Sequence, residues 1–146
     1  MLALAATAWG ADASAVEGLV VKVVDGDTIH VRVGERVEKV RYIGVNTPEV
    51  HHPTRGEEPG GRAAWDVNRQ LVAGRHVRLE LDVQARDRYG RLLAYVWVGE
   101  TMVNAELVDR GYAQVMTVPP NVRHQQLFLR LQRDAREAGR GLWRRA

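Results

Sequence analysis

The sequence predicts an α+β fold that is mainly β, a five-stranded barrel of the OB type with three α-helices. Two observations lead to this fold class. Short runs rich in β-branched residues follow one another with turn signals between them, first as a group of three and later as a pair. Three segments with helical spacing of apolar residues stand between or after these runs. Five short strands and a few helices in one chain are typical of such small barrels.

The first three expected strands form an antiparallel meander. Residues 16–25 are rich in valine, and Asp25-Gly26 is a hairpin signal that leads into the alternating residues 28–33. After a second turn, residues 37–45 are expected to form the third strand.

The middle of the chain predicts a loop, a helix and a second hairpin. Residues 46–61 hold three prolines and a Gly-Gly pair, which indicates a loop, and a loop of this length is usually functional or mobile. Residues 64–74 have helical spacing and end in a glycine. The alternating residues 77–83 and 92–98 predict two strands, with a turn at residues 87–90.

Two more helices are expected in the last third of the chain. Residues 102–110 carry apolar side chains on one side, and a glycine follows as a stop signal. Asn121 is the expected N-cap of the last helix, whose other face holds arginines that we expect to be solvated. The apolar stripe of this helix consists of Leu127, Leu131, Ala135 and Ala138.

Composition indicates one globular domain, residues 16–146. The chain has 146 residues, 45% hydrophobic and 27% charged, which is the balance of a folded protein with a core of its own. It has no cysteine, so disulfides and thiolate metal sites are excluded. Any metal is therefore held by oxygen or imidazole, which favours Ca²⁺ or Mg²⁺. No stretch is long enough to span a membrane.

The basic residues are almost all arginine. Lys22 and Lys39 are the only lysines among 21 basic residues, so 19 are arginine. Arginine suits phosphate because its planar fork can bond two oxygens at once. The alternative is the coding bias of a GC-rich genome. A pI near 9.7 agrees with a polyanionic partner.

Residues 1–15 have the character of the end of a signal peptide. A short apolar run leads to an A-x-A site that would be cut before Val16. The basic region that usually precedes such a run is missing, so the alternatives are a mis-assigned start or an ordinary tail. We expect a secreted or periplasmic protein.

Residues 41–49 end in a pairing of cation and carboxylate. A strand that carries Arg41 and a turn that carries Glu49 would place a fixed cation near a fixed base. Hydrolysis of a phosphodiester needs both, the cation for charge developing on phosphate and the base to orient water. A solvated surface ion pair is the alternative.

Two further stretches carry carboxylates on glycine turns, residues 25–28 (Asp-Gly-Asp-Thr) and residues 87–91 (Asp-Arg-Tyr-Gly-Arg). Each is by itself first a turn motif. The spacing after Asp25 does not match an EF-hand.

In their order and spacing, the three stretches resemble the staphylococcal nuclease (thermonuclease) family. The resemblance covers residues 18–143. Its motifs are VDGDT at residues 24–28, R-x-I-G-V-x-T-P-E at residues 41–49 and D-R-Y-G-R-x-L-A-Y at residues 87–95.

The resemblance implies a Ca²⁺-dependent, sugar-nonspecific endonuclease on an OB barrel, which breaks the P–O5′ bond of DNA and RNA and leaves 3′-phosphate ends. We expect it to prefer single strands and to be a monomer. The alternative is a non-catalytic OB module of the same type that only binds nucleic acid. A purely structural OB domain would not require these polar residues.

The resemblance also implies roles for individual residues. Asp27 matches the first calcium carboxylate, the Thr47 backbone carbonyl matches a further ligand, and Asn46 stands at the position of another. Glu49 matches the proposed general base. The residues that match phosphate-binding arginines are Arg41 and Arg91, and those expected near the metal or substrate are Asp25, Arg55 and Arg88.

Two departures from the family pattern bear on the site. Asn46 stands where the best-known member has a second calcium aspartate, which predicts weaker metal binding because ligand charge tunes Ca²⁺ affinity. Thr117 and Pro119 stand where that member has two tyrosines beside the nucleotide. Loss of those rings removes stacking area and predicts a different nucleotide affinity.

Overall fold

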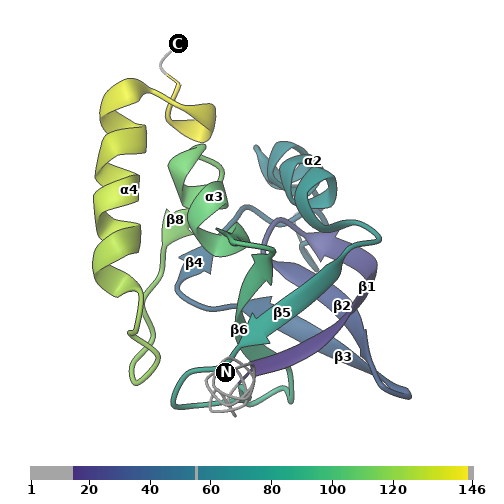
Figure 1. Ribbon diagram of the computed structural model, residues 1–146. Coiled ribbons are helices and arrows are strands. Elements are labelled where there is room, and N and C mark those ends of the chain that lie inside the picture. The colour runs from purple at the N-terminus through teal and green to yellow at the C-terminus, as the bar shows by residue number, and fades with distance from the viewer. Residues whose placement is uncertain (1–14, 55, 145–146) are drawn as a thin grey trace.

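A closed barrel of five strands forms the body of the protein (Figure 1), in a computed structural model that describes residues 15–54 and 56–144. The strand order is β3-β2-β1-β5-β6, and a parallel pairing of β3 with β6 closes the barrel. The barrel strands are β1 (Ala15–Asp25), β2 (Thr28–Val33), β3 (Arg36–Tyr42), β5 (His76–Glu80) and β6 (Leu92–Val98). The predicted fold class is confirmed.

Three helices and three short strands complete the described fold. In Figure 1, α3 lies between α4 and the barrel, and α2 packs on β1. The helices are α2 (Gly61–Val72), α3 (Val103–Asp109) and α4 (Gln125–Ala138), with a 3₁₀ turn η1 (Gly141–Trp143). The short strands, which the sequence did not predict, are β4 (Val45–Asn46), β7 (Thr101–Met102) and β8 (Gln114–Val115). In the described part of the chain, every helix is too short or too polar to cross a membrane.

Alternation along the strands produces the core. Ile29 and Val31 of β2 are fully buried, whereas His30 between them faces outward with partial exposure. Leu107 of α3 and Phe128 of α4 close the core from the helical side. Burial of each such side chain contributes roughly 1.5–3 kcal/mol.

The third strand ends earlier than expected, at Tyr42 rather than at residue 45. Gly44 has φ of 80°, and a Cβ added there would lie 2.7 Å from the Phe128 ring. Only glycine therefore fits this turn between β3 and β4, against which Phe128 of α4 packs. The turn redirects Val45 and Asn46 into a pairing with β8, which brings Asn46 beside the end of β3.

Two other boundaries differ from the prediction. The strand expected over residues 77–83 ends at Glu80, where the chain leaves the sheet. Asn121 does not cap the last helix, which begins at Gln125. Its side chain instead bonds both the N–H and the carbonyl of Gln84, at 2.8 and 2.9 Å. Asn121 thus fastens the loop between β5 and β6, a contact that sequence spacing cannot indicate.

Residues 1–14 and Arg55 lie outside the described residues. The expected signal segment and the expected role of Arg55 therefore stay predictions. Ala15, the last residue of that segment, is the first residue of β1 and pairs with Glu80 of β5.

Candidate active site

The turn between β1 and β2 places Asp27 at the edge of the barrel, where only 5% of the residue is exposed. The Thr28 hydroxyl donates to Oδ1 at 2.9 Å, and the Thr47 N–H donates to Oδ2 at 3.0 Å. The Arg41 guanidinium lies 3.4 Å from Oδ2. One hydrogen bond to each oxygen fixes the carboxylate and leaves lone pairs available to a cation.

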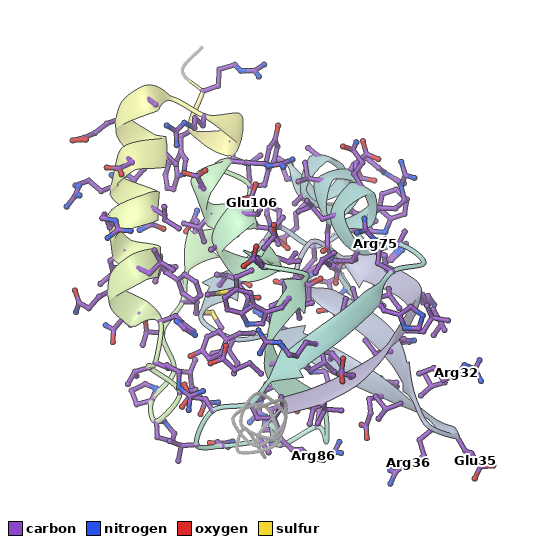
Figure 2. The ribbon with its side chains drawn as sticks, in the orientation of Figure 1. Arg32, Glu35, Arg36, Arg75, Arg86 and Glu106 are labelled. Atoms are coloured by element: carbon purple, nitrogen blue, oxygen red, sulfur yellow. The ribbon has the colours of Figure 1, made fainter. Side chains whose placement is uncertain are left out.

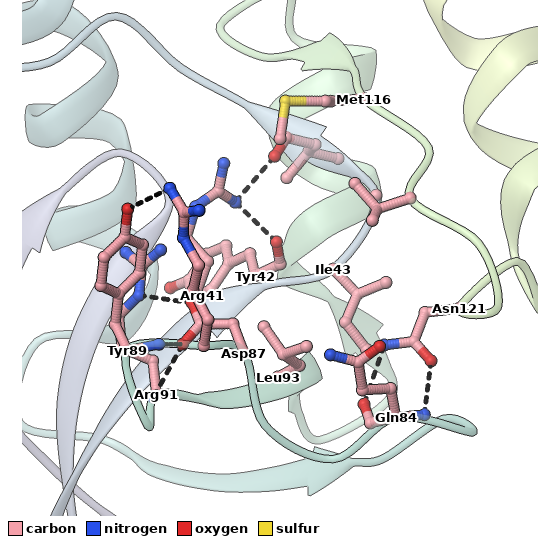
Figure 3. Close-up of a pocket in the computed structure, with 14 residues that line it drawn as sticks. Arg41, Tyr42, Ile43, Gln84, Asp87, Tyr89, Arg91, Leu93, Met116 and Asn121 are labelled. Atoms are coloured by element: carbon pink, nitrogen blue, oxygen red, sulfur yellow. Dashed lines mark hydrogen bonds and ion pairs between the residues drawn. The ribbon is translucent and has the colours of Figure 1, made fainter.

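Arg41 is held near the end of β3 by main-chain acceptors. Its Nη1 donates to the carbonyls of Tyr42 and Val45, at 2.7 and 2.8 Å, as Figure 3 shows. Its Nη2 donates to Oδ1 of Asn46 at 3.2 Å. With its side chain only 13% exposed, Arg41 is a preorganised cation. In the described structure it pairs with Asp27, and the surface ion pair with Glu49 that was the alternative does not form.

Glu49 lies in the loop after β4, and three hydrogen bonds fix the backbone of Glu49 and Val50. Its N–H donates to Oε1 of Glu58 and its carbonyl accepts from the Glu58 N–H, both at 2.8 Å. The next residue, Val50, donates its N–H to Oδ1 of Asp25 at 3.0 Å. Glu49 is exposed, and its carboxylate bonds to no other described residue. The loop thus presents a free carboxylate on an anchored backbone.

Asp25 was expected near the metal, and the structure gives it a backbone role. Its carboxylate holds the Val50 N–H, as just described, and its carbonyl accepts from Nδ2 of Asn68 at 2.9 Å. Asn68 is fully buried in α2 and also accepts from the Tyr42 hydroxyl at 2.6 Å. Asp25 therefore links the Glu49 loop to β1 and α2.

The turn between β5 and β6 orients Arg91. Oδ1 of Asp87 accepts from the N–H groups of Tyr89 and Arg91, both at 3.0 Å, and Oδ2 accepts from Nε of Arg91 at 2.8 Å. Burial raises the pKa of Asp87, but the hydrogen bonds from Arg91 and Tyr89 lower it by more. The pKa of Asp87 therefore lies below its usual value. A charged Asp87 thus holds the Arg91 guanidinium by one edge.

Arg41 and Arg91 line the same hollow, which has a volume of about 500 Å³ and lies where β3 and β6 meet (Figure 3). Its wall is largely aliphatic, with Leu93, Met116 and Val118. Two guanidinium groups beside an apolar wall suit a ligand that joins a phosphate to a flat, largely apolar group.

Tyr89 at this hollow is a residue that sequence analysis noted only as part of a motif. It is 69% exposed, and its hydroxyl accepts from Nη2 of Arg88 at 2.7 Å. The guanidinium carbons of Arg88 and Arg91 lie 4.9 and 5.6 Å from its ring centre. Thr117 and Pro119 do not line the hollow. Of the two tyrosines that line the hollow, Tyr42 is buried, so the exposed ring is that of Tyr89 in the β5–β6 turn.

Sequence analysis also did not identify Asn104 of α3, which stabilises the strands behind the hollow. It is fully buried, donates to the carbonyls of Ile43 and Ala94, and accepts from the Val96 N–H. It thereby joins the end of β3 to β6 behind the hollow. The sequence offered one signal for this role, a polar residue among apolar ones in a predicted helix. It could not indicate the partners of Asn104, which lie in distant strands.

The oxygen donors near Arg41 fit a hard divalent cation. Oδ2 of Asp27 and Oδ1 of Asn46 both lie within 3.4 Å of one Arg41 nitrogen, so these two side chains converge. The Thr47 hydroxyl is buried and has no partner among the described residues. Within the same residues, no group of three or more histidines and carboxylates could hold a metal. Asp27 is the one carboxylate among these oxygen donors, so the set brings little negative charge to a divalent cation.

The structure thus brings together Asp27, Arg41, Asn46 and Thr47, and it sets Arg88 and Arg91 at the hollow that Arg41 also lines. The Glu49 carboxylate contacts none of these residues, and only its loop is fixed near them, by the bond from Val50 to Asp25. An OB barrel that presents two fixed guanidinium groups, an oxygen-donor set and a free carboxylate belongs to the class of proteins that bind phosphate esters and can hydrolyse them.

Comparison with known proteins narrows this class. The family model for staphylococcal nuclease homologues matches residues 39–145. The thermonuclease of Staphylococcus intermedius is 39% identical over 127 residues, which are 87% of this chain and 76% of that protein. The thermonuclease of Staphylococcus hyicus is 39% identical over 124 residues, 85% of this chain and 73% of that protein. The SPbeta prophage-derived endonuclease YokF of Bacillus subtilis (strain 168) is 37% identical over 124 residues, 84% of this chain and 42% of that protein. The chain belongs to the staphylococcal nuclease family, and it is accordingly a hydrolase of the nuclease kind.

Proposed function

We propose that this protein is a Ca²⁺-dependent, sugar-nonspecific endonuclease that hydrolyses DNA and RNA and leaves 3′-phosphate ends. The observation that carries the proposal is the placement of Arg41, which lines one hollow with Arg91 and also contacts Asp27. A phosphate in that hollow would meet two guanidinium groups beside the oxygen-donor set. The names of the relatives, thermonuclease and endonuclease, support the same reaction.

Arg41 and Arg91 bind and stabilise the reacting phosphate. Each is already oriented, Arg41 by two carbonyls and Arg91 by Asp87, so little reorganisation is needed as negative charge grows on the phosphate oxygens. One such preorganised donor is worth roughly 10²–10³ in kcat.

Glu49 is the general base in this proposal. It accepts a proton from water as the water oxygen attacks phosphorus and the P–O5′ bond breaks, and the leaving O5′ oxygen takes up a proton from solvent to give a 5′-hydroxyl end. Support comes from its exposed carboxylate, which no described residue neutralises, and from the three backbone contacts that fix its loop. A positioned base contributes typically 10²–10⁴-fold.

Asp27, Asn46 and the Thr47 carbonyl would hold Ca²⁺. When bound, the ion supplies positive charge next to the phosphate and orients water. We propose further that single strands are preferred, that the protein is a monomer, and that it acts after export, as a secreted or periplasmic enzyme.

The test is cleavage of single-stranded DNA and RNA by the purified protein, with Ca²⁺ and with chelator. We expect cleavage only with the metal, and products whose 3′ ends a phosphatase can dephosphorylate. Glu49→Ser should lower kcat by about 10²–10⁴-fold while oligonucleotide affinity is retained. Glu57→Ser is the matched control, because Glu57 is an exposed glutamate of the same loop that pairs with Arg62. Binding without cleavage across a series of metals would make the protein a nucleic-acid-binding module instead.

A further inference from the structure

A row of basic side chains crosses the outer face of the barrel. Lys22 of β1 is paired in register with His30 of β2, and His30 is paired with Lys39 of β3. Paired residues of neighbouring strands point to the same face. The neighbours of His30 in β2, Ile29 and Val31, are buried in the core, so the row faces outward. We call Lys22, His30 and Lys39 the lysine row.

Both lysines of the row are exposed, and in the described structure neither forms an ion pair. Exposed arginines elsewhere do form ion pairs. Three examples on or next to α2 and α3 are Arg62–Glu57, Arg69–Asp66 and Arg110–Glu106. Burial lowers the pKa of His30, and the charges of Lys22 and Lys39 lower it further. The row is therefore a concentration of positive charge that the protein does not itself neutralise.

The lysine row continues the candidate active site. Arg41 follows Lys39 by two residues on the same strand and therefore points to the same face. Its partner on β2, Thr28, likewise precedes His30 by two residues. Rows two residues apart are separated by about 6.7 Å. A cation thus recurs on this face one row beyond the phosphate-binding arginine.

The row offers further contacts at its Lys22 end and, two residues beyond His30, along β2. At the Lys22 end, a hollow of about 290 Å³ is lined by Val21, Trp65 and Arg69 among others. Beyond the row towards the β2–β3 hairpin, Figure 2 shows Arg32 pointing away from the barrel. Positive charge therefore continues along β2 beyond the row.

We propose that the lysine row binds a backbone phosphate of the substrate strand, at a subsite beyond the phosphate held by Arg41 and Arg91. This inference rests on the proposed function, because it takes single-stranded nucleic acid as the substrate. Exposed ammonium groups bind phosphate as point charges and release counterions on doing so. A strand that occupies both sites would follow the outer face of β3 from Arg41 towards Lys39.

The two lysines allow a direct test, because an amine-selective acetylating reagent has no other lysine target in this chain. The Glu49→Ser protein would be acetylated with Ca²⁺ present, alone, with a dinucleotide that carries a single phosphate, or with a 12-nucleotide single strand, and analysed by peptide mass spectrometry. We expect the 12-mer to slow acetylation of Lys22 and Lys39 several-fold and the dinucleotide to have no effect. Equal acetylation with and without the 12-mer overturns the proposal.

A charge variant provides the second measurement. For single strands, log K falls with log salt by about 0.7 for each phosphate neutralised. Lys22→Gln/Lys39→Gln removes the contact to that one phosphate and should therefore reduce the slope for the 12-mer by about 0.7. Its kcat/KM on a dinucleotide should stay unchanged. The control Arg130→Gln/Arg133→Gln removes the same charge from the exposed face of α4 and should leave the slope unchanged.

An unchanged slope, an equal effect of the α4 control, or an equal loss on the dinucleotide would each overturn the lysine row as a subsite. The proposed function fails by a different result, namely absence of cleavage by the unsubstituted protein with every metal. Binding and acetylation are measured without turnover, so the two failures are distinguishable.

Discussion

Two polar clusters on this barrel each pair a carboxylate with an arginine, and they differ in how many of their donors and acceptors have partners. The first, which we call the helix-side cluster, joins β5 to the start of α4. Oε1 of Glu80 accepts from the Trp97 indole at 2.9 Å, and Oε2 accepts from Arg123 at 2.7 Å. His124 lies 3.2 Å from the same Oε2. Each donor here meets an acceptor, so the cluster fastens α4 to the barrel.

The candidate active site is satisfied only in part. Asp27 and Arg41 are well fixed, but the Thr47 hydroxyl has no partner and the Glu49 carboxylate is free among the described residues. Asn46 gives its oxygen to a single contact, at 3.2 Å. Buried polar groups in folded proteins are normally satisfied. The comparison indicates that a ligand can bind at the candidate active site, because hydrogen-bonding groups there still lack partners.

The largest effect that would sharpen this comparison is expected from Arg41→Gln. We expect kcat on single-stranded DNA to fall by roughly 10²–10³-fold, equivalent to about 2.7–4 kcal/mol of barrier, because one preorganised donor is lost. The free energy of unfolding in urea should change less, by about 1–2 kcal/mol, for the lost hydrogen bonds. The control Arg123→Gln, in the helix-side cluster, should leave kcat unchanged. Arg41→Gln with kcat within threefold of the unsubstituted protein contradicts the assignment.

The opposite pattern is expected for Glu80→Gln, with stability reduced and kcat unchanged. The loss should be about 1–3 kcal/mol at pH 7, because three donors lose a charged acceptor; the partial exposure of Arg123 keeps it below the cost of a fully buried pair. Urea unfolding measures the loss, and turnover at low temperature measures kcat.

The same variant predicts a pH dependence. Burial raises the pKa of Glu80, but hydrogen bonds from Arg123, Trp97 and His124 lower it by more. The pKa of Glu80 in the folded protein therefore lies below the ordinary value of 4.5. A lowered folded pKa stabilises the protein fully above that ordinary value and progressively less as pH falls through the folded one. The stability difference between Glu80→Gln and the unsubstituted protein should therefore shrink below about pH 4.5. A difference of the same size at pH 7 and pH 3 would contradict this account.

Local patterns explain why much of the fold was predictable. Alternating residues and Asp-Gly or glycine turns are short-range signals, and they located the five barrel strands and three helices within a few residues. The same short motifs carry Asp27, Arg41 and Arg91, which is why these residues were named before their geometry was known. In the structure, Arg41 contacts Asp27, and Arg91 is held by Asp87 of its own motif.

Contacts between distant segments explain what was missed. The parallel pairing of β3 with β6 and the small β4–β8 sheet depend on segments 50 to 70 residues apart. Asn121 bonds Gln84 across 37 residues, so its resemblance to a helix cap misled the prediction. A polar side chain that serves a remote backbone has no periodic signal, because its partner depends on how the whole barrel closes.

The smallest effect concerns Asn46, the residue that separates this site from one with a second carboxylate. Asn46→Asp should tighten Ca²⁺ about tenfold, because it adds a negative charge next to Asp27 and ligand charge tunes affinity. The gain is limited because Oδ1 of residue 46 already accepts from Arg41, and an added charge strengthens that competing contact. A Ca²⁺ titration by calorimetry, with activity measured alongside, gives the affinity directly. Gln126→Glu adds the same charge on the exposed face of α4 and should not change it. If both variants bind Ca²⁺ as the unsubstituted protein does, the carboxylate count does not limit the metal site and the prediction is wrong.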